Sequence, residues 1–220
     1  MYTKEQIDRF AKLANELDEK IAKRDFLTAN YKDVPVLKEL DSILNERKDE
    51  EKETLSFAYE GFSYLADKYT GLGRFAISQK YNQAALDMAI LLFKKYEYRP
   101  EGVEEVLSNL LRDRNYYVDD DCKDVLKALK GVALFEEEEL KRIFDRRMAH
   151  RRNLKHDPVE MTQEYLDVID EVEEKIEKNR SSYRGMGSCY EVWDLKARFL
   201  LEKGIKWKSP SMMNPRVIFD

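Results

Sequence analysis

The chain has 220 residues, 43% of them hydrophobic and 38% charged, so it can bury a sizeable core beneath a heavily charged surface. Its net charge of -5 excludes a general attraction to nucleic acid or to an anionic membrane, which leaves only a local basic site. Eight glycines and five prolines are few, and with abundant Lys, Glu, Leu and Ala they favour long helices over a turn-rich sheet fold.

Apolar residues recur at helical spacing from the N-terminus onward. Thr3 and Gln6 form a capping box that begins the first helix, and a second helix follows Pro35. The charged run at 45–53 predicts a break, after which a third helix continues to about Tyr69.

Turns at 70–73 and 99–102 bound the most hydrophobic helix, which covers about 74–96. Because its apolar residues occupy more than one face, we expect this helix to lie in the centre of the protein. Two shorter helices are expected at about 101–115 and 120–130, the second capped by one of the aspartates at 119–121.

The helical pattern continues in the second half of the chain. A helix is expected from the acidic run at 136–139 to Pro158, then one over about 159–180 and one that ends at Gly204. About eight helices with short connections predict an all-α protein, either an irregular helical bundle or a short stack of antiparallel helix pairs. We expect a single domain over 1–204, with a subdivision near 98–102 as the alternative.

The last residues, 205–220, are too apolar to be left in water. We expect an extended strap that packs on the last helices, with Trp193 and Trp207 as anchors. The alternative is a docking peptide for another subunit, which keeps a homo-oligomer open.

One pair of consecutive expected helices carries a regular pattern of residue types. The first helix has an aromatic residue, a small residue and a tyrosine, and the second has an apolar residue, an aromatic residue and an alanine. Its residues are Phe57, Gly61, Tyr64, Ile77, Tyr81 and Ala84. This stretch, 57–84, resembles a tetratricopeptide motif, in which the small residue lets a partner helix approach and the aromatics fill the seam. The resemblance implies stacked helix pairs, and an ordinary irregular bundle is the alternative.

Tyrosines concentrate in the middle of the chain. A tyrosine-lined helical groove suits a protein partner, because tyrosine offers contact area at a low entropy cost. The alternative is that these rings fill seams between helices, where each hydroxyl needs a hydrogen-bond partner. The candidate partner-binding tyrosines are Tyr59, Tyr64, Tyr81 and Tyr96.

The helix that begins at the acidic run ends in basic residues, among them Arg147, Arg151 and Arg152. Acids at the start of a helix and bases at its end both complement the helix dipole. The basic end also continues the apolar stripe, so it either projects beyond the core or faces anions. A partner's acidic surface and nucleic acid are the two functional alternatives, and the three arginines are candidate partner-binding residues.

Arg151 and His156 are spaced as Arg-x4-His, which resembles the HEPN group of helical ribonucleases. The resemblance implies that the arginine holds developing phosphate charge while the histidine moves a proton. A surface histidine without a chemical role is the default interpretation. This alternative would make 147–156 an RNA-processing or nucleic-acid-binding segment.

A glycine-containing stretch before the last helix is a candidate anion site, because exposed N–H groups at a helix start attract negative charge. Its residues are Arg184, Gly185, Gly187 and Ser188. The alternative is a flexible link followed by a capping box of Ser188 and Glu191. Cys189 in the first turn is a distant candidate for a nucleophile.

No metal-ligand spacing, nucleotide fingerprint or catalytic signature is present in the sequence, so we expect no metal and no cofactor. Two cysteines are too few for a disulfide framework, and no apolar run could span a bilayer, so we expect a cytoplasmic protein without a membrane partner. The favoured function is a non-enzymatic helical module that binds a protein partner.

Overall fold

The computed structural model describes residues 1–23, 31–117, 122–149, 154–182 and 185–219, with the backbone alone for 147–149. These residues form helices and no strand, which confirms the all-α prediction. The α-helices are α1 (Lys4–Ala22), α2 (Val34–Asn45), α3 (Lys52–Gly71), α4 (Phe75–Tyr96), α5 (Val103–Tyr117), α6 (Lys123–Leu129), α7 (Glu137–Ala149), α8 (Gln163–Asn179), α9 (Ser188–Glu202) and α10 (Pro210–Met213). Two short 3₁₀ helices, η1 (Tyr31–Asp33) and η3 (Pro158–Met161), precede α2 and α8.

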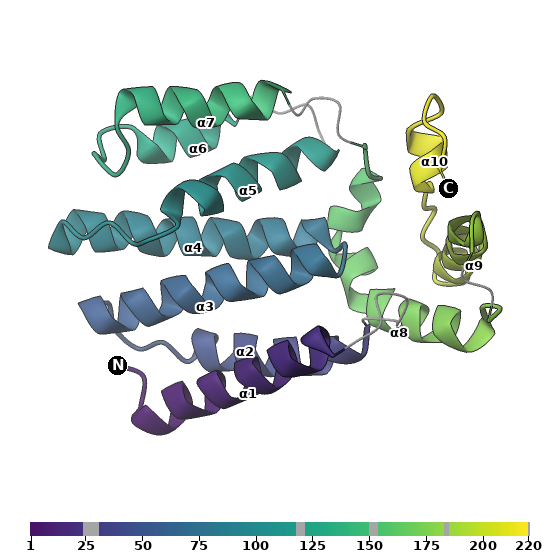
Figure 1. Ribbon diagram of the computed structural model, residues 1–220, viewed down its shortest axis with the longest axis horizontal. Helices are drawn as coiled ribbons and strands as arrows, with labels where there is room; N and C mark the ends of the chain where they lie inside the picture. The colour runs from purple at the N-terminus through teal and green to yellow at the C-terminus, as the bar shows by residue number, and fades with distance from the viewer. Residues whose placement is uncertain (24–30, 118–121, 150–153, 183–184, 220) are drawn as a thin grey trace.

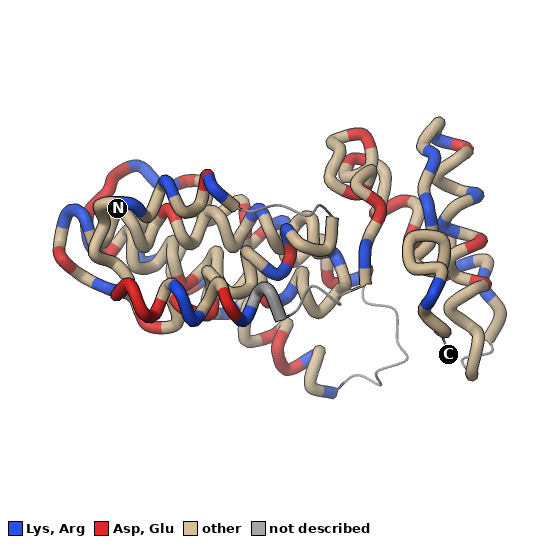
Figure 2. The backbone as a smooth tube through the Cα atoms, turned by 90° about the horizontal axis from the view of Figure 1, so that it is seen from above, with Lys and Arg blue, Asp and Glu red and all other residues tan. Residues whose placement is uncertain are grey.

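The first seven helices are stacked in layers, as Figure 1 shows. At one end of this stack α8 leads away from the layers, and α9 and α10 lie beyond it. Seen from above in Figure 2, the stack and the α9–α10 part are two bodies with acidic and basic residues intermixed along both. Within the described residues, none of the helices is both long and apolar enough to cross a membrane.

A continuous apolar core holds the stack together, from Tyr2 in the first layer to Ile143 in α7. The central helix, α4, packs on α3 at one side and on α5 at the other, as its two apolar faces predicted. The core includes residues on both sides of the turn at 98–102.

Gly61 on α3 allows an unusually close approach between two helices. A β-carbon at this position would lie 2.4 Å from Cδ2 of Leu44, which is fully buried on α2. The resemblance led us to expect the partner helix of the 57–84 pair at Gly61, whereas the helix that approaches it most closely is the preceding one, α2.

A second, separate apolar core joins α8, α9 and the C-terminal segment. Ile205 and Trp207 are each 8% exposed, so the first part of this segment is packed as a strap. Its far end is not, since Ile218 is 89% exposed. The segment is also not extended throughout, because Pro210–Met213 form α10, which Ser209 caps through a hydrogen bond from the Met212 amide.

Two expectations about helix ends were wrong. The helix predicted to continue to Pro158 is described as far as Ala149, and 154–157 are not helical. Asp157 instead caps η3 by accepting a 3.1 Å hydrogen bond from the Val159 amide. By contrast, the capping box of Thr3 and Gln6 is present as predicted.

The predicted capping box of Ser188 and Glu191 is the second error. Gly187, with a φ of 81°, takes the N-cap position of α9 and offers no side chain. The carboxylate of Glu191 accepts hydrogen bonds of 2.7 Å from both the amide and the hydroxyl of Ser181.

Candidate functional site

An open groove of about 340 Å³ lies between α3 and the start of α5. Its walls carry four carboxylates and, among the described residues, no lysine or arginine. The lining residues are Tyr59, Glu60, Ser63, Asp67, Asn82, Glu101, Gly102, Glu105, Val106 and Asn109. We call this surface the acidic groove.

Two hydroxyl groups of the acidic groove already donate hydrogen bonds to the protein itself. The hydroxyl of Tyr59 donates to the carbonyl oxygen of Glu101 at 2.8 Å, and that of Ser63 donates to the carbonyl oxygen of Tyr59 at 2.8 Å. Burial raises the pKa of Tyr59 to about 12, so its hydroxyl keeps its proton at neutral pH. Both hydroxyls therefore present only acceptor lone pairs to a ligand.

Asn82, which is 2% exposed, brings α4 into the groove lining. Its amide nitrogen lies 3.3 Å from Ser78 Oγ and 3.3 Å from Asp113 Oδ2. Asp113 is fully buried, and burial raises the pKa of its carboxyl although Arg112 and Ser78 counter this shift. None of the described residues donates a hydrogen bond to the amide oxygen of Asn82.

Most of the negative charge on the rim of the acidic groove has no ion-pair partner in the part of the chain that the structure describes. Glu60, Glu101 and Glu105 are exposed, and none of the three forms an ion pair with another described residue. Asp67 has a neighbouring cation, since its Oδ2 is 3.4 Å from the Lys68 ammonium. The groove therefore carries excess negative charge at neutral pH.

The structure does not bring the four candidate tyrosines together on one surface. Tyr59 lines the acidic groove, whereas Tyr81 is buried and stacks on Tyr69 with ring centroids 5.4 Å apart. The hydroxyl of Tyr64 donates to Asp18 at 3.0 Å, and that of Tyr96 donates to the carbonyl oxygen of Glu50 at 3.0 Å. Most of these rings lie in seams between helices, with their hydroxyls bonded internally.

The basic candidates can be placed only in part. The side chains of Arg147, Arg151 and Arg152 lie outside the described residues. His156 is described, and it is packed among three aromatic rings, with centroid distances of 5.1 Å to Phe75, 5.2 Å to Tyr116 and 5.8 Å to Tyr117. It lies in a non-helical segment, so the helical setting expected for an Arg-x4-His pair is absent there.

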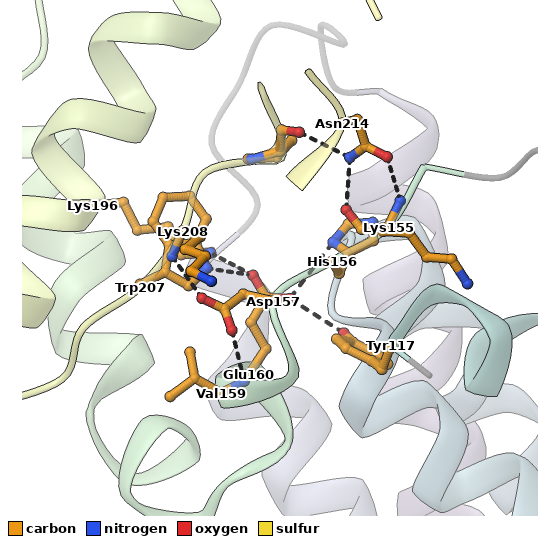
Figure 3. Close-up of polar contacts among 11 residues, drawn as sticks. Tyr117, Lys155, His156, Asp157, Val159, Glu160, Lys196, Trp207, Lys208 and Asn214 are labelled. Carbon is orange, nitrogen blue, oxygen red and sulfur yellow. Dashed lines mark hydrogen bonds and ion pairs between the residues drawn. The ribbon is translucent and has the colours of Figure 1, made fainter. Parts of the chain in front are cut away.

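His156 lies beside a buried polar network around Glu160, which Figure 3 shows. This network lies where the stack contacts α8, α9 and the C-terminal segment. Glu160 is 6% exposed and accepts hydrogen bonds from the Tyr117 hydroxyl at 3.2 Å and the Trp207 indole at 2.7 Å. His156 Nδ1 lies 3.6 Å from its carboxylate, and the Lys196 ammonium lies 3.8 Å away. Burial opposes ionisation of Glu160, but His156, Lys196 and Trp207 together outweigh it and lower the pKa below 4.5.

The neighbouring residues tie the C-terminal segment to the stack (Figure 3). Asp157 accepts a 2.6 Å hydrogen bond from the Lys208 amide. The side chain of Asn214 pairs with the backbone of Lys155 through two hydrogen bonds of 2.8 Å, one in each direction. The Lys155 ammonium in turn donates to the carbonyl oxygen of Asn115 on α5 at 2.8 Å.

A second polar contact fixes α8 against the stack. The buried guanidinium of Arg74 lies 2.5 Å from Asp170 and 2.6 Å from Glu173, and Asp170 also pairs with Lys38. Burial opposes the charge on Arg74, but the two carboxylates outweigh it and raise its pKa. A cavity of about 90 Å³ beside this contact is lined by Arg74, Glu173, Glu160 and Lys196, which already pair among themselves.

The anion candidate is not supported by its geometry. Arg184 lies outside the described residues, and the Ser188 amide donates a 3.1 Å hydrogen bond to the carbonyl oxygen of Gly185. With Gly187 as the N-cap of α9, the described part of this stretch is a tight turn. Cys189 is half-buried in the first turn of α9.

The described residues hold no group of three or more His, Cys, Asp or Glu side chains that could bind a metal ion. No protein-family model matches the chain, and neither the curated proteins nor the solved structures contain a significant match to it.

The residues that shape the acidic groove were not singled out from the sequence, except for Tyr59. They come from three elements, so no period or spacing links them. The one available signal was the unbalanced acidic pair Glu101 and Glu105 at the start of a helix, which the helix dipole explains equally well.

Proposed function

We propose that this chain is a non-enzymatic helical interaction module whose acidic groove receives a segment of a protein partner. The observation that carries the proposal is the groove itself: an open hollow of about 340 Å³ with three exposed glutamates that form no ion pair with another described residue. Charged groups of one sign in a concave surface attract a partner of the opposite sign and orient it as it approaches.

The surroundings of the groove support this role. Its walls belong to α3 and α5, which pack on the two sides of the buried helix α4, so the groove is held by the core of the stack. Tyr59 and Val106 add apolar surface beside the carboxylates. A rigid, partly apolar hollow with a polar rim is a common form of partner-binding surface.

The nucleic-acid alternative has less support from the described residues. Lys155 and His156 are engaged in contacts within the chain, and the groove is acidic, which repels phosphates. The arginines on which this alternative depends lie outside the described residues, and nothing in the described part favours it.

The proposal is tested by site-specific photocrosslinking with the full chain in a cell extract. A photoreactive amino acid replaces Glu105 in the groove or, as the control, Glu5 on the exposed side of α1. We expect one defined adduct from the groove position, reduced by the charge reversal Glu60→Lys and unaffected by Glu5→Lys. Equal crosslinking from both positions, or insensitivity to Glu60→Lys, would contradict it.

A further inference from the structure

The acidic groove is unusual in the balance of its hydrogen-bonding groups. The hydroxyls of Tyr59 and Ser63 donate to backbone carbonyl groups, so they offer only lone pairs to a ligand. Glu60, Glu101 and Glu105 are acceptors when ionised. A ligand that fits the groove must therefore supply hydrogen-bond donors.

Asn82 extends this pattern into the buried part of the groove. Its amide nitrogen faces Ser78 and the carboxylate of Asp113, and this pairing fixes which end of the amide is the oxygen. The oxygen then points away from Asp113, and none of the described residues donates to it. The Asn82 side chain is 2% exposed as a whole, but its oxygen is not among the fully buried polar atoms that lack a partner. It therefore keeps some contact with solvent and can accept a hydrogen bond from a ligand in the groove.

We propose that the acidic groove binds an arginine side chain of the partner segment, with the guanidinium between the carboxylates and the amide oxygen of Asn82. This inference rests on the proposed function and specifies its partner chemistry. A guanidinium has five donors in a planar fork and remains charged, so it serves acceptors on the floor and on both walls together. A lysine ammonium presents three donors at one point and reaches fewer of them.

The size and lining of the groove agree with a side chain attached to a peptide. A volume of about 340 Å³ exceeds that of one arginine side chain and leaves room for adjoining backbone. Val106 and the ring of Tyr59 provide apolar surface for the methylene stem. The occupant that fits this lining is therefore an arginine-containing protein segment, and a free polyamine, which lacks the planar fork of a guanidinium, should bind more weakly.

The experiment is an NMR titration of the isotope-labelled full chain with acetylated pentapeptides Gly-Ser-Xaa-Ser-Gly that carry arginine, lysine or citrulline at the centre, and with spermidine. We expect the arginine peptide to shift the side-chain amide signals of Asn82 and the backbone signals of 101–109. Its affinity should exceed that of the uncharged citrulline peptide by about tenfold or more. Equal affinities for arginine and citrulline, shifts confined to other regions, or tighter binding of spermidine would each overturn the inference.

Matched variants separate local recognition from net charge. Glu60→Gln with Glu105→Gln removes two rim charges, and Glu137→Gln with Glu138→Gln removes two exposed charges at the start of α7. We expect about a tenfold loss of arginine-peptide affinity in the first variant and less than about a twofold loss in the second. Equal losses would overturn the inference.

The experiments distinguish failure of the proposed partner binding from failure of the arginine inference. If a partner crosslinks to the groove but its segment contains no arginine, the function stands and the arginine inference falls. If the arginine peptide binds as expected but no partner reaches the groove in the extract, the chemistry stands and the proposed function falls.

Discussion

The indole nitrogen of Trp207 donates a 2.7 Å hydrogen bond to Glu160, although the two residues are 47 positions apart. Both side chains are buried, and the same carboxylate accepts a bond from Tyr117 at the end of α5. One acidic side chain thus links the C-terminal segment to the stack.

Replacing this acid should destabilise the protein strongly. Glu160→Ala leaves the Trp207 indole and the Tyr117 hydroxyl without a partner, and we expect a loss of about 3 kcal/mol in the free energy of unfolding. Trp207→Phe removes one donor and should cost about 1–2 kcal/mol. Urea unfolding of both single variants and the double variant measures their coupling, and strict additivity would show that the bond contributes nothing.

The same carboxylate should give the protein an acid-sensitive component of stability. The folded-state pKa of Glu160 is lowered from 4.5, so its ionised form stabilises the folded state above that pH. This contribution is lost as the pH falls through the lowered value. We expect the free energy of unfolding to decrease less steeply below pH 4.5 in Glu160→Gln than in the parent protein.

Asp113 is a useful control, because its pKa is shifted in the opposite direction to that of Glu160. Burial raises its pKa, so its contribution is full at low pH and is lost as the pH rises through the raised value. Asp113→Asn should therefore make the acid-induced loss of stability steeper. Identical pH profiles for Asp113→Asn and Glu160→Gln would contradict both assignments.

Gly61→Ala should be destabilising although alanine is the better helix former. The new β-carbon would meet the buried Leu44 side chain at 2.4 Å, and the displacement should cost about 1–3 kcal/mol. Gly71 provides the control, because an added β-carbon there meets no atom within 4 Å. Gly71→Ala should be neutral or stabilising by less than about 1 kcal/mol, and chemical denaturation distinguishes the two variants.

Truncation after Gly204 should lower the thermal unfolding temperature clearly. It removes Ile205 and Trp207 from the second core, and a loss of about 3 kcal/mol corresponds to a decrease of roughly 10 °C in a chain of this size. Ile218→Ser, at a position that is 89% exposed, should leave the transition unchanged. An unchanged transition after truncation would mean that the segment is free to bind a partner.

The sequence predicted most helices because their signals are local. Thr3 and Gln6 cap α1 through side chains three residues apart, and the turns before α4 and after it contain glycine or proline. Apolar periodicity then predicted which helix, α4, lies at the centre of the stack. These features depend on neighbours along the chain, which a sequence shows directly.

What the sequence could not predict depends on distant partners. Glu160 and Asp113 look like ordinary charged residues on amphipathic helices, and only packing against Trp207 and Ser78 makes them buried centres of polar networks. The capping box at Ser188 failed for a similar reason, since Glu191 bonds to Ser181, ten residues away. The residues of the acidic groove come from three elements, so no regular spacing in the sequence links them.

The division of the apolar residues into two cores has a consequence for how the protein opens. The stack and the α8–α9 part have separate apolar cores, and buried polar contacts, such as those of Arg74 with Asp170 and Glu173, lie between them. We therefore expect separation of the two parts to cost less free energy than unfolding of the stack. We therefore expect two cooperative units, with α8 and α9 exchanging their amide hydrogens through a sub-global opening that leaves the stack protected. The ion pairs of Arg74 with Asp170 and Glu173 hold the two units together, so their strength should determine how often the smaller unit separates from the stack.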